Sequence, residues 1–511
     1  MSDTILDLLS RGDANAVAIG APERISTTYD GLRAHAAQTV ATLRDFGIGR
    51  NDRIAIVLPN GPEMASAFVS VAAGATTAPL NPAYRDEEFE FYLSDLNAKA
   101  LIVADGDESP AVAVAKRLGI TVLELSSQPT DTAGSFALVG DAAAAPSEDG
   151  DSKADDIALV LHTSGTTSRP KIVPLSHTNV CASARNISTT LSLVADDRCL
   201  NVMPLFHIHG LMGAVLSSLA AGASVHCPPG FNALRFFAWL EEVRPTWYTA
   251  VPTMHQAILS RAARNREIIE DSDLRLIRSS SASLPSQVMA ELEEVFGVPV
   301  IESYGMTEAA HQMASNPLPP QARKPGSVGL PAGPEVAIFD ESGAVQDQGT
   351  VGEVVIRGAN VTHGYEANPE ANATAFDDGW FRTGDQGYFD EDGYLTITGR
   401  LKEIINRGGE KISPLEVDEI LMDHEAVAQA VTFALPHDKL GEDVAAAIVL
   451  RDGSSLTEKE LRDFAAQRLA AFKVPRTIVF LEEIPKGATG KLQRIGLADK
   501  LGLTETSAAA Q

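Results

Sequence analysis

The segment between Thr163 and Lys171 has the composition of a phosphate-binding loop. It reads Thr163-Ser164-Gly165-Thr166-Thr167-Ser168-Arg169-Pro170-Lys171 and follows an apolar run, residues 157–161, that predicts a buried strand. Small residues let backbone N–H groups approach phosphate oxygens, hydroxyl groups add donors, and a lysine supplies a full positive charge. The loop lacks the Gly-Lys-Ser/Thr ending of a Walker motif. We therefore expect the chain to bind a polyphosphate through a loop of another kind.

Five further motifs follow along the chain. In order they are Tyr304-Gly305-Met306-Thr307-Glu308, Gly379-Trp380-Phe381-Arg382-Thr383-Gly384-Asp385, Gly399-Arg400-Leu401-Lys402-Glu403, Arg407-Gly408-Gly409-Glu410-Lys411-Ile412-Ser413-Pro414 and Pro485-Lys486-Gly487-Ala488-Thr489-Gly490-Lys491. Together with the first loop, they resemble the motifs of the adenylate-forming superfamily. That superfamily includes acyl-CoA synthetases, 4-coumarate–CoA ligases, luciferases and the adenylation domains of peptide synthetases. The resemblance extends over essentially the whole chain.

The resemblance implies a two-step acid–CoA ligase with ATP and CoA as co-substrates and Mg²⁺ as cofactor. A carboxylate would attack the α-phosphorus of ATP and release diphosphate. The CoA thiolate would then attack the acyl-adenylate and release AMP. Two anions must meet in the first step, so positive charge is needed at the α-phosphate. The residues that the resemblance makes catalytic are Lys491, Thr307, Glu308 and His207.

A nucleotide site is implied by the same motifs. Tyr304 would lie against adenine, Thr307 would contact the α-phosphate, Asp385 would accept hydrogen bonds from the ribose, and Arg400 would contact ribose or phosphate. Glu308 would hold Mg²⁺, which prefers hard oxygen ligands. The complete set implied for ATP and AMP is Thr163, Ser164, Gly165, Thr166, Thr167, Lys171, Ser281, Ala282, Glu302, Ser303, Tyr304, Gly305, Thr307, Asp385, Arg400 and Lys491.

The last motifs imply a moving C-terminal part. Lys491 would bridge the attacking carboxylate and the α-phosphate during adenylation. A rotation about a hinge at Lys402 would then remove Lys491 and bring in the loop with Gly408, Gly409 and Glu410, which would line the path of CoA. One lid with two faces would thus let one cleft serve both steps.

Two imidazoles and a hydroxyl group predict the acyl pocket. His207 and Ser281 follow predicted strands, at the edge where doubly wound folds place ligands, and His311 lies four residues after Thr307. Residues 89–95, 246–253 and 307–319 resemble the oxalate–CoA ligase group of plants and fungi, apart from Ser280, where a cysteine is expected. In that group, residues matching His207, Ser281 and His311 hold oxalate. A histidine, charged or neutral, with a serine suits the distal carboxylate of so small a dianion.

Several other functions stay open. A ligase for malonate, glycolate or another short acid is the nearest alternative, although we expect an arginine in the acyl pocket for malonate and the sequence alone places none there. An adenylation enzyme that loads a carrier protein is a second alternative. A non-catalytic relative is disfavoured because Glu308, Asp385 and Lys491 are all present. Luciferase-like oxidation is disfavoured because a compact polar pocket has little room for a luminophore.

The elements that would position these residues predict an α/β fold. Short apolar runs alternate with helical spacing over residues 53–104 and 199–302, which is typical of right-handed βαβ units. We expect a large N-terminal domain, residues 1–399, with two doubly wound sheets and a small β-rich subdomain after about Gly326. A small mobile α+β domain, residues 400–511, would follow the hinge near Lys402.

Composition limits the partners. The 511 residues carry a formal net charge of -27, which argues against binding to nucleic acid or to an anionic membrane surface. The three cysteines, Cys181, Cys199 and Cys227, show no framework spacing and fit a reducing compartment. Neither a secretory signal nor a peroxisomal C-terminal tripeptide is apparent, so we expect a cytoplasmic protein. The oligomeric state is left open.

Overall fold

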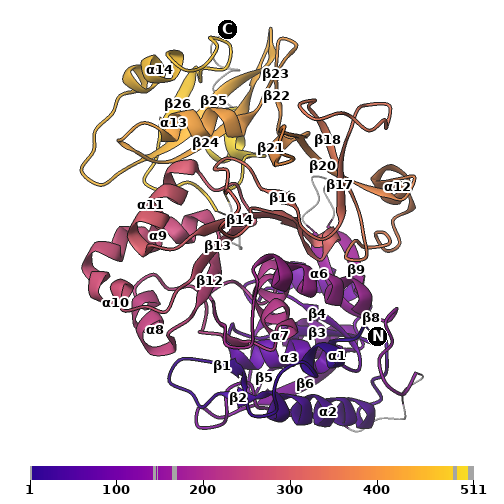
Figure 1. Cartoon of the computed structure of the whole chain (residues 1–511). Coiled ribbons are helices and arrows are strands. Elements are labelled where there is room, and N and C mark those ends of the chain that lie inside the picture. The colour runs from indigo at the N-terminus through magenta and orange to yellow at the C-terminus, as the bar shows by residue number, and fades with distance from the viewer. Residues whose placement is uncertain (1–2, 142–145, 147, 164–169, 487–491, 505–511) are drawn as a thin grey trace.

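The structure is a computed structural model that describes residues 3–141, 146, 148–163, 170–486 and 492–504. The described residues form four β-sheets (Figure 1). The first sheet consists, in spatial order, of β7 (Ala137–Val139), β6 (Thr121–Ser126), β5 (Ala100–Ala104), β3 (Arg53–Val57), β4 (Thr76–Pro79), β8 (Ile157–Thr163) and β9 (Lys171–Ser176). Its central strands β6, β5, β3, β4 and β8 are parallel, and β7 and β9 pair antiparallel at the two edges.

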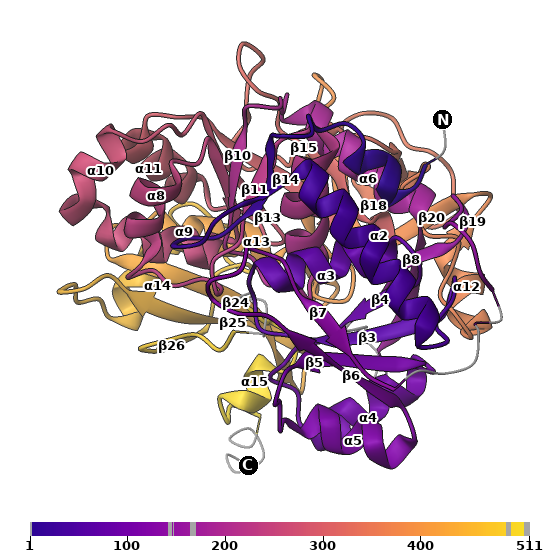
Figure 2. The same ribbon diagram turned by 90° about the horizontal axis from the view of Figure 1, so that it is seen from below.

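Both faces of the first sheet are covered by helices. The strand β3 alternates between two cores. Ile54 and Ile56 pack with α2 (Tyr29–Asp45) and α3 (Pro62–Ala72), whereas Ala55 and Val57 pack with α4 (Asp86–Asp95) and α5 (Pro110–Leu118). Figure 2 shows these helix pairs on opposite sides of the sheet. Coverage of both faces explains why β3 is a continuous apolar run, as buried parallel strands are.

The second sheet has a parallel centre and antiparallel edges. Its order is β16 (Leu330–Pro331), β15 (His311–Ser315), β14 (Val300–Met306), β13 (Leu276–Ser280), β12 (Trp247–Ala250), β10 (Arg198–Asn201), β11 (Ser224–His226), β1 (Val17–Gly20) and β2 (Thr27–Thr28). The strands from β14 to β1 are parallel. One face packs on α6 (His177–Thr190), the π-helix η1 (His209–Leu216) and α7 (Ser217–Ala220). The other face packs on α8 (Phe236–Val243), α9 (Pro252–Ala262) and α11 (Ser286–Phe296).

A shared core joins the first two sheets. The helix α3 contacts β4 of the first sheet and β1 of the second, and its side chains belong to one apolar cluster with residues of both. The remaining helical segments before residue 310 are α1 (Ile5–Leu9), η2 (Ala263–Asn265), α10 (Arg266–Glu270) and η3 (Thr307–Ala309). The predicted pair of doubly wound sheets is therefore confirmed.

Two smaller sheets follow. The third contains β17 (Glu335–Phe339), β18 (Gly352–Arg357), β20 (Trp380–Phe389), β19 (Phe376–Asp377) and β21 (Leu395–Arg400), with α12 (Pro369–Ala375) beside it. The fourth contains β23 (Glu410–Ile412), β22 (Ile405–Arg407), β25 (Gly441–Leu450), β24 (Val427–His437) and β26 (Thr477–Phe480). Its helices are α13 (Pro414–Met422), α14 (Glu458–Ala466) and α15 (Leu497–Lys500). The predicted β-rich region and small α+β C-terminal region are thus present.

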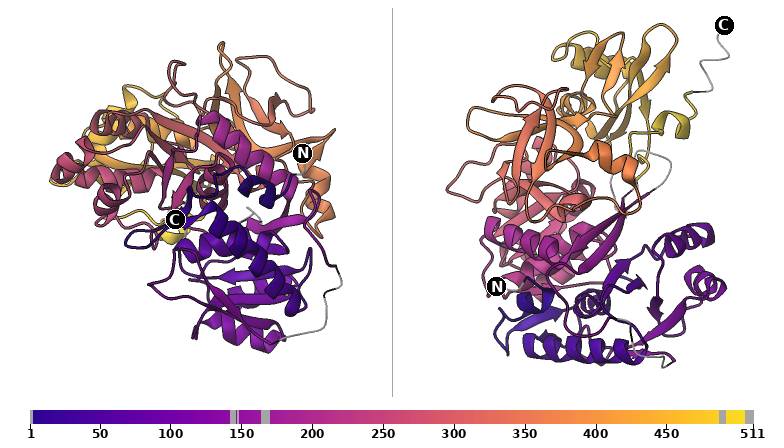
Figure 3. Two further views of the ribbon diagram at one scale, coloured as in Figure 1. Left: turned by 60° about the horizontal axis from the view of Figure 1, so that its bottom comes forward. Right: turned by 90° about the vertical axis from the view of Figure 1, so that its right-hand side faces the viewer.

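The C-terminal sheet lies at the opposite end of the molecule from the first sheet, as the right-hand view of Figure 3 shows. It packs against α9 and α11. Gln256 of α9 donates a hydrogen bond to the carbonyl oxygen of Ala428 at 2.9 Å, and Gln287 of α11 bonds Asp423. Apolar side chains of both units share one cluster. Through these contacts, the segment after Arg400 packs on the larger part of the chain.

Candidate active site

Residues from three separate motifs meet at Asp385. The Tyr304 hydroxyl group donates a hydrogen bond to Asp385 Oδ2 at 2.5 Å, and Arg400 Nε donates to Asp385 Oδ1 at 3.1 Å. The pairing of β20 with β21 places Asp385 directly opposite Arg400. Burial raises the pKa of Tyr304 well above its usual value, so the phenol remains a donor. The carboxylate that is predicted to bind the ribose is therefore held in one orientation.

Glu308 is a buried carboxylate with one fixed oxygen. The Tyr365 hydroxyl group donates to Glu308 Oε1 at 2.8 Å, and the Nζ of Lys171 lies 4.3 Å from the centroid of the Tyr365 ring. Burial raises the pKa of Glu308. Among the described residues, no lysine, arginine or histidine forms an ion pair with it. A buried carboxylate without such a partner fits a divalent cation, because burying an unpaired charge is costly.

Other predicted nucleotide residues surround this pair. Glu302, Ser303 and Gly305 lie on β14, and Ala282 is exposed just after β13. Ser280 donates a hydrogen bond to the carbonyl oxygen of Ser303 at 2.9 Å, which joins the ends of the two strands. Thr163 pairs with Lys171 across the β8–β9 hairpin. Four predicted phosphate-loop residues and the predicted catalytic lysine lie outside the described residues: Ser164, Gly165, Thr166, Thr167 and Lys491.

The predicted CoA loop is a tight turn. Gly408 and Gly409 have φ of 61° and 96° and connect β22 to β23, which begins at Glu410. The Gly408 N–H group donates to the carbonyl oxygen of Leu440 at 2.8 Å. Lys402 follows the end of β21. The roles of these residues in CoA binding and hinge motion stay predictions.

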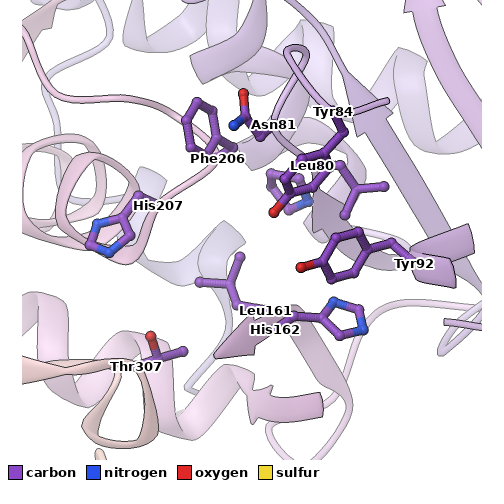
Figure 4. Close-up of a pocket in the computed structure, with 10 residues that line it drawn as sticks. Leu80, Asn81, Tyr84, Tyr92, Leu161, His162, Phe206, His207 and Thr307 are labelled. Atoms are coloured by element: carbon purple, nitrogen blue, oxygen red, sulfur yellow. The ribbon is translucent and has the colours of Figure 1, made fainter. Parts of the chain in front are cut away.

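His207 and Thr307 line a small pocket (Figure 4). In this view they lie across the cavity from Tyr92 and His162. The Nδ1 of His207 accepts a hydrogen bond from the His209 N–H group at 3.3 Å. The remaining lining residues are Pro79, Leu80, Asn81, Tyr84, Leu161 and Phe206. Aromatic and imidazole groups thus surround a cavity that has room only for something small.

Ser281 and His311 are connected by a third histidine that is not among the residues predicted from the sequence. His209 Nδ1 lies 3.0 Å from Ser281 Oγ, and His209 Nε2 lies 2.6 Å from Thr249 Oγ1. The ring centroids of His209 and His311 are 5.0 Å apart. His209 is the first residue of the π-helix η1, a rare conformation that is frequent at functional sites. Its position two residues after His207 is a sequence signal that could have marked it.

Backbone strain is concentrated at the same place. Ser281, Ala310 and His311 have φ of 75°, 46° and 105°. Positive φ costs free energy in residues that carry a Cβ, and such residues persist where the surrounding structure holds them. The strained positions include two of the three residues predicted to bind the acid.

An arginine, which the sequence alone did not place here, also reaches this cluster. Arg278 of β13 is fully buried, and its Nη1 lies 3.1 Å from His311 Nε2. Burial lowers the pKa of Arg278 to about 9, so the group stays positively charged at neutral pH. A charged residue inside the buried strand Leu276–Ser280 was the available signal. The histidine cluster therefore contains a positive charge in addition to the predicted His207, Ser281 and His311.

Glu302 leads to a prediction about the pH dependence of stability. Its Oε1 accepts a hydrogen bond from the Leu284 N–H group at 2.8 Å, Oε2 has no partner among the described residues, and burial raises its pKa to about 8. The folded state therefore holds this proton more tightly than the unfolded chain. The resulting stabilisation is present at low pH and is lost, at up to about 1.4 kcal/mol per pH unit, as the pH rises toward that pKa.

Glu302→Gln keeps the side chain neutral at every pH. We expect the variant's free energy of unfolding, relative to the unchanged protein, to rise by about 1–2 kcal/mol between pH 5.5 and 7.5. Urea unfolding at the two pH values measures this difference. An equal difference at both would mean that Glu302 is already ionised at pH 5.5.

The chain belongs to the AMP-binding enzyme family. The main domain of that family matches residues 9–366, and its C-terminal domain matches residues 416–491. The first match contains Tyr304, the buried Glu308 and the histidine cluster described above. None of the described helices is long and apolar enough to cross a membrane.

Individual relatives are similar over nearly their full length. An oxalate–CoA ligase of Arabidopsis thaliana is 48% identical over 460 residues, covering 88% of each chain. An oxalate–CoA ligase of Saccharomyces cerevisiae is 42% identical over 480 residues, covering 88% of this chain and 87% of the relative. The crystal structure of ATP-bound MatB from Rhodopseudomonas palustris superposes with a TM-score of 0.86 at 28% identity and covers 99% of both chains.

Proposed function

We propose that this protein is an AMP-forming acid–CoA ligase that converts oxalate, ATP and CoA to oxalyl-CoA, AMP and diphosphate. The observation that carries the choice of acid is the histidine cluster: His207 at a small pocket, and Ser281 joined through His209 to His311. Such a site suits a short polar acid better than a fatty tail. The similarity to two oxalate–CoA ligases supports the same choice.

In the first step, a carboxylate oxygen of the acid bonds to the α-phosphorus of ATP, and the bond to the β-phosphate breaks to release diphosphate. Asp385, oriented by Tyr304 and Arg400, would hold the ribose. Lys491 would place positive charge between the attacking carboxylate and the α-phosphate, where negative charge accumulates. Mg²⁺, when bound at Glu308, would supply further charge neutralisation.

In the second step, the CoA sulfur bonds to the carbonyl carbon, and the bond from that carbon to AMP breaks. We assign this step to a rotation of residues 400–511 against residues 1–399 about Lys402. The rotation would exchange Lys491 for the Gly408–Glu410 turn. We place the reaction in the cytoplasm, where the buried thiols of Cys181, Cys199 and Cys227 would remain reduced.

Malonate is the second candidate acid. We expect an arginine in the acyl pocket of a malonate ligase, and Arg278 lies beside His311. CoA-dependent AMP release with oxalate, malonate, glycolate, acetate and a medium-chain fatty acid separates the two. Preference for oxalate with an oxalyl thioester as product would support the proposal. Preference for another acid would overturn the choice of acid. Acid-dependent ATP–diphosphate exchange without CoA-dependent AMP release would favour a carrier-loading enzyme.

Replacing His311 tests the acyl pocket. We expect His311→Ala to raise the KM for oxalate about tenfold, because a donor to the distal carboxylate is lost, and to leave the KM for ATP within about twofold. Initial rates at saturating CoA measure both constants. Equal increases in both would contradict a role for His311 in binding the acid.

A further inference from the structure

Arg278 is a buried cation without an acidic partner. Its side chain is fully buried, and among the described residues it forms no ion pair. Its recorded hydrogen bonds go to neutral acceptors, His311 Nε2 at 3.1 Å and Gln312 Oε1 at 3.3 Å, while its Nε has no partner in the described part of the chain. By contrast, Arg275, three residues earlier, pairs with Asp197 at 2.7 Å. Burying an unpaired charge costs free energy, so the presence of Arg278 needs a functional explanation, such as a bound ligand.

The contact with Arg278 determines the state of His311. A guanidinium group has donors and no acceptor, so His311 Nε2 must accept the hydrogen bond and cannot carry a proton. The proton of His311 is then on Nδ1. That nitrogen faces Gly305, since a Cβ atom on Gly305 would lie 2.7 Å from it. Gly305 belongs to the Tyr304–Glu308 motif, where the nucleotide is predicted to lie. Arg278 therefore determines which nitrogen of His311 is the donor, and that nitrogen lies beside Gly305.

The glycine at position 213 of the π-helix η1 leaves room for the contact between Arg278 and His311. A Cβ atom on Gly213 would lie 2.7 Å from His311 Nε2 and 2.9 Å from Arg278 Nη1. Any side chain at this position would therefore press on the two groups. The His311–Arg278 pair is thus enclosed by β13, β15 and η1, with His209 next to the His311 ring.

Building on the proposed function, we propose that Arg278 is a positioning residue that makes the site selective for short dianionic acids. It holds His311 as an Nδ1 donor and places a permanent positive charge behind it. The first carboxylate of the acid reacts at the α-phosphate, whereas the second remains ionised and needs a counter-charge inside the protein. A monoanionic acid of the same size has no second carboxylate, and the charge of Arg278 gives it no advantage.

The test compares Arg278→Met with Arg275→Met. Methionine is a long, flexible apolar residue of similar reach, and replacing an unpaired buried cation with it is expected to leave thermal stability unchanged or raised. We expect Arg278→Met to lower kcat/KM for oxalate about 30-fold and kcat/KM for acetate less than threefold, with an unchanged KM for ATP. Arg275→Met, which leaves Asp197 unpaired, should lower thermal stability and keep the oxalate-to-acetate ratio.

A pH profile distinguishes a positioning role of Arg278 from a merely structural one. Without the guanidinium, His311 can take a second proton as the pH falls, and an imidazolium would replace part of the lost charge. The oxalate-to-acetate ratio of Arg278→Met should therefore rise from pH 8 to pH 6, and adding His311→Gln should abolish that rise. In the described part of the chain, Arg278 from β13 and His209 from η1 are the titratable and charged groups seen to contact His311, while β14 contributes Gly305 and Met306. Because His209 is kept in the double variant, its own titration is controlled.

Gly213→Ala provides a second perturbation that leaves Arg278 in place. We expect it to lower the same ratio by pressing on the His311–Arg278 contact. Equal losses with oxalate and acetate in Arg278→Met, together with lower thermal stability, would overturn the proposal. If the unchanged protein prefers a monoanionic acid, the proposed function itself fails. If it prefers another dianion, such as malonate, the same variants are tested with that acid and the role of Arg278 stands or falls independently.

Discussion

Replacing Lys491 with alanine is expected to slow adenylate formation about 10³-fold, because the positive charge that offsets the meeting of carboxylate and triphosphate is lost. Lys491 itself lies outside the described residues, and the described residues on either side of it have defined contacts. Lys486 forms a β-bridge with Leu492, and Arg494 pairs with the buried Asp418 of α13 at 2.6 Å. ATP–diphosphate exchange in the presence of the acid measures this half-reaction.

The second half-reaction separates a catalytic role from damage to the fold. CoA thioester formation from a supplied acyl-adenylate should proceed within about threefold of the unchanged rate in Lys491→Ala, because thiol attack does not use this lysine. Lys486→Ala is the matched control. It removes a lysine of the same segment whose partner is Glu483 at 2.8 Å, and it should leave both half-reactions intact. Equal loss of both half-reactions in Lys491→Ala would show that the lysine serves the structure of the segment.

The sheets could be predicted because their strands are buried on both faces. Short apolar runs were predicted within residues 53–104, and the strands β3, β4 and β5 lie there with nearly every side chain buried. By contrast, α5 and β6, between residues 105 and 130, have no predicted counterpart. The strand β6 alternates between exposed and buried positions near the sheet edge, so its sequence lacks the continuous apolar run that marked its neighbours.

Side-chain partnerships were harder to predict than strands. His207 and Ser281 were predicted from their places after strands, and His311 from its spacing to Thr307. The link through His209 depends on the π-helix η1, which places its ring beside Ser281. The role of Arg278 could not be predicted for a related reason. The sequence shows that a charged residue lies in a predicted strand. The absence of an acidic partner among the described residues is seen only when β13, β15 and η1 are packed together.

The buried state of Glu308 leads to the last prediction. Glu308→Gln is expected to lower the rate of adenylate formation about 100-fold at a fixed low Mg²⁺ concentration, because an amide oxygen is a weaker ligand for Mg²⁺ than a carboxylate. The Tyr365 hydroxyl group can still donate to the amide oxygen, so the side chain keeps its place. Raising the Mg²⁺ concentration should restore part of the lost rate, and a Mg²⁺ titration of ATP–diphosphate exchange measures the shift.

Tyr365→Phe is the control for this experiment, because it removes the hydrogen bond to Glu308 Oε1 and keeps the charge. We expect it to shift the Mg²⁺ titration by less than about fivefold. The comparison is informative because the carboxylate forms no ion pair among the described residues, and Arg400 and Lys171 act on it only through their charges. A Glu308→Gln variant with an unaltered Mg²⁺ dependence would show that other groups hold the ion, and the buried charge of Glu308 would then need a different explanation.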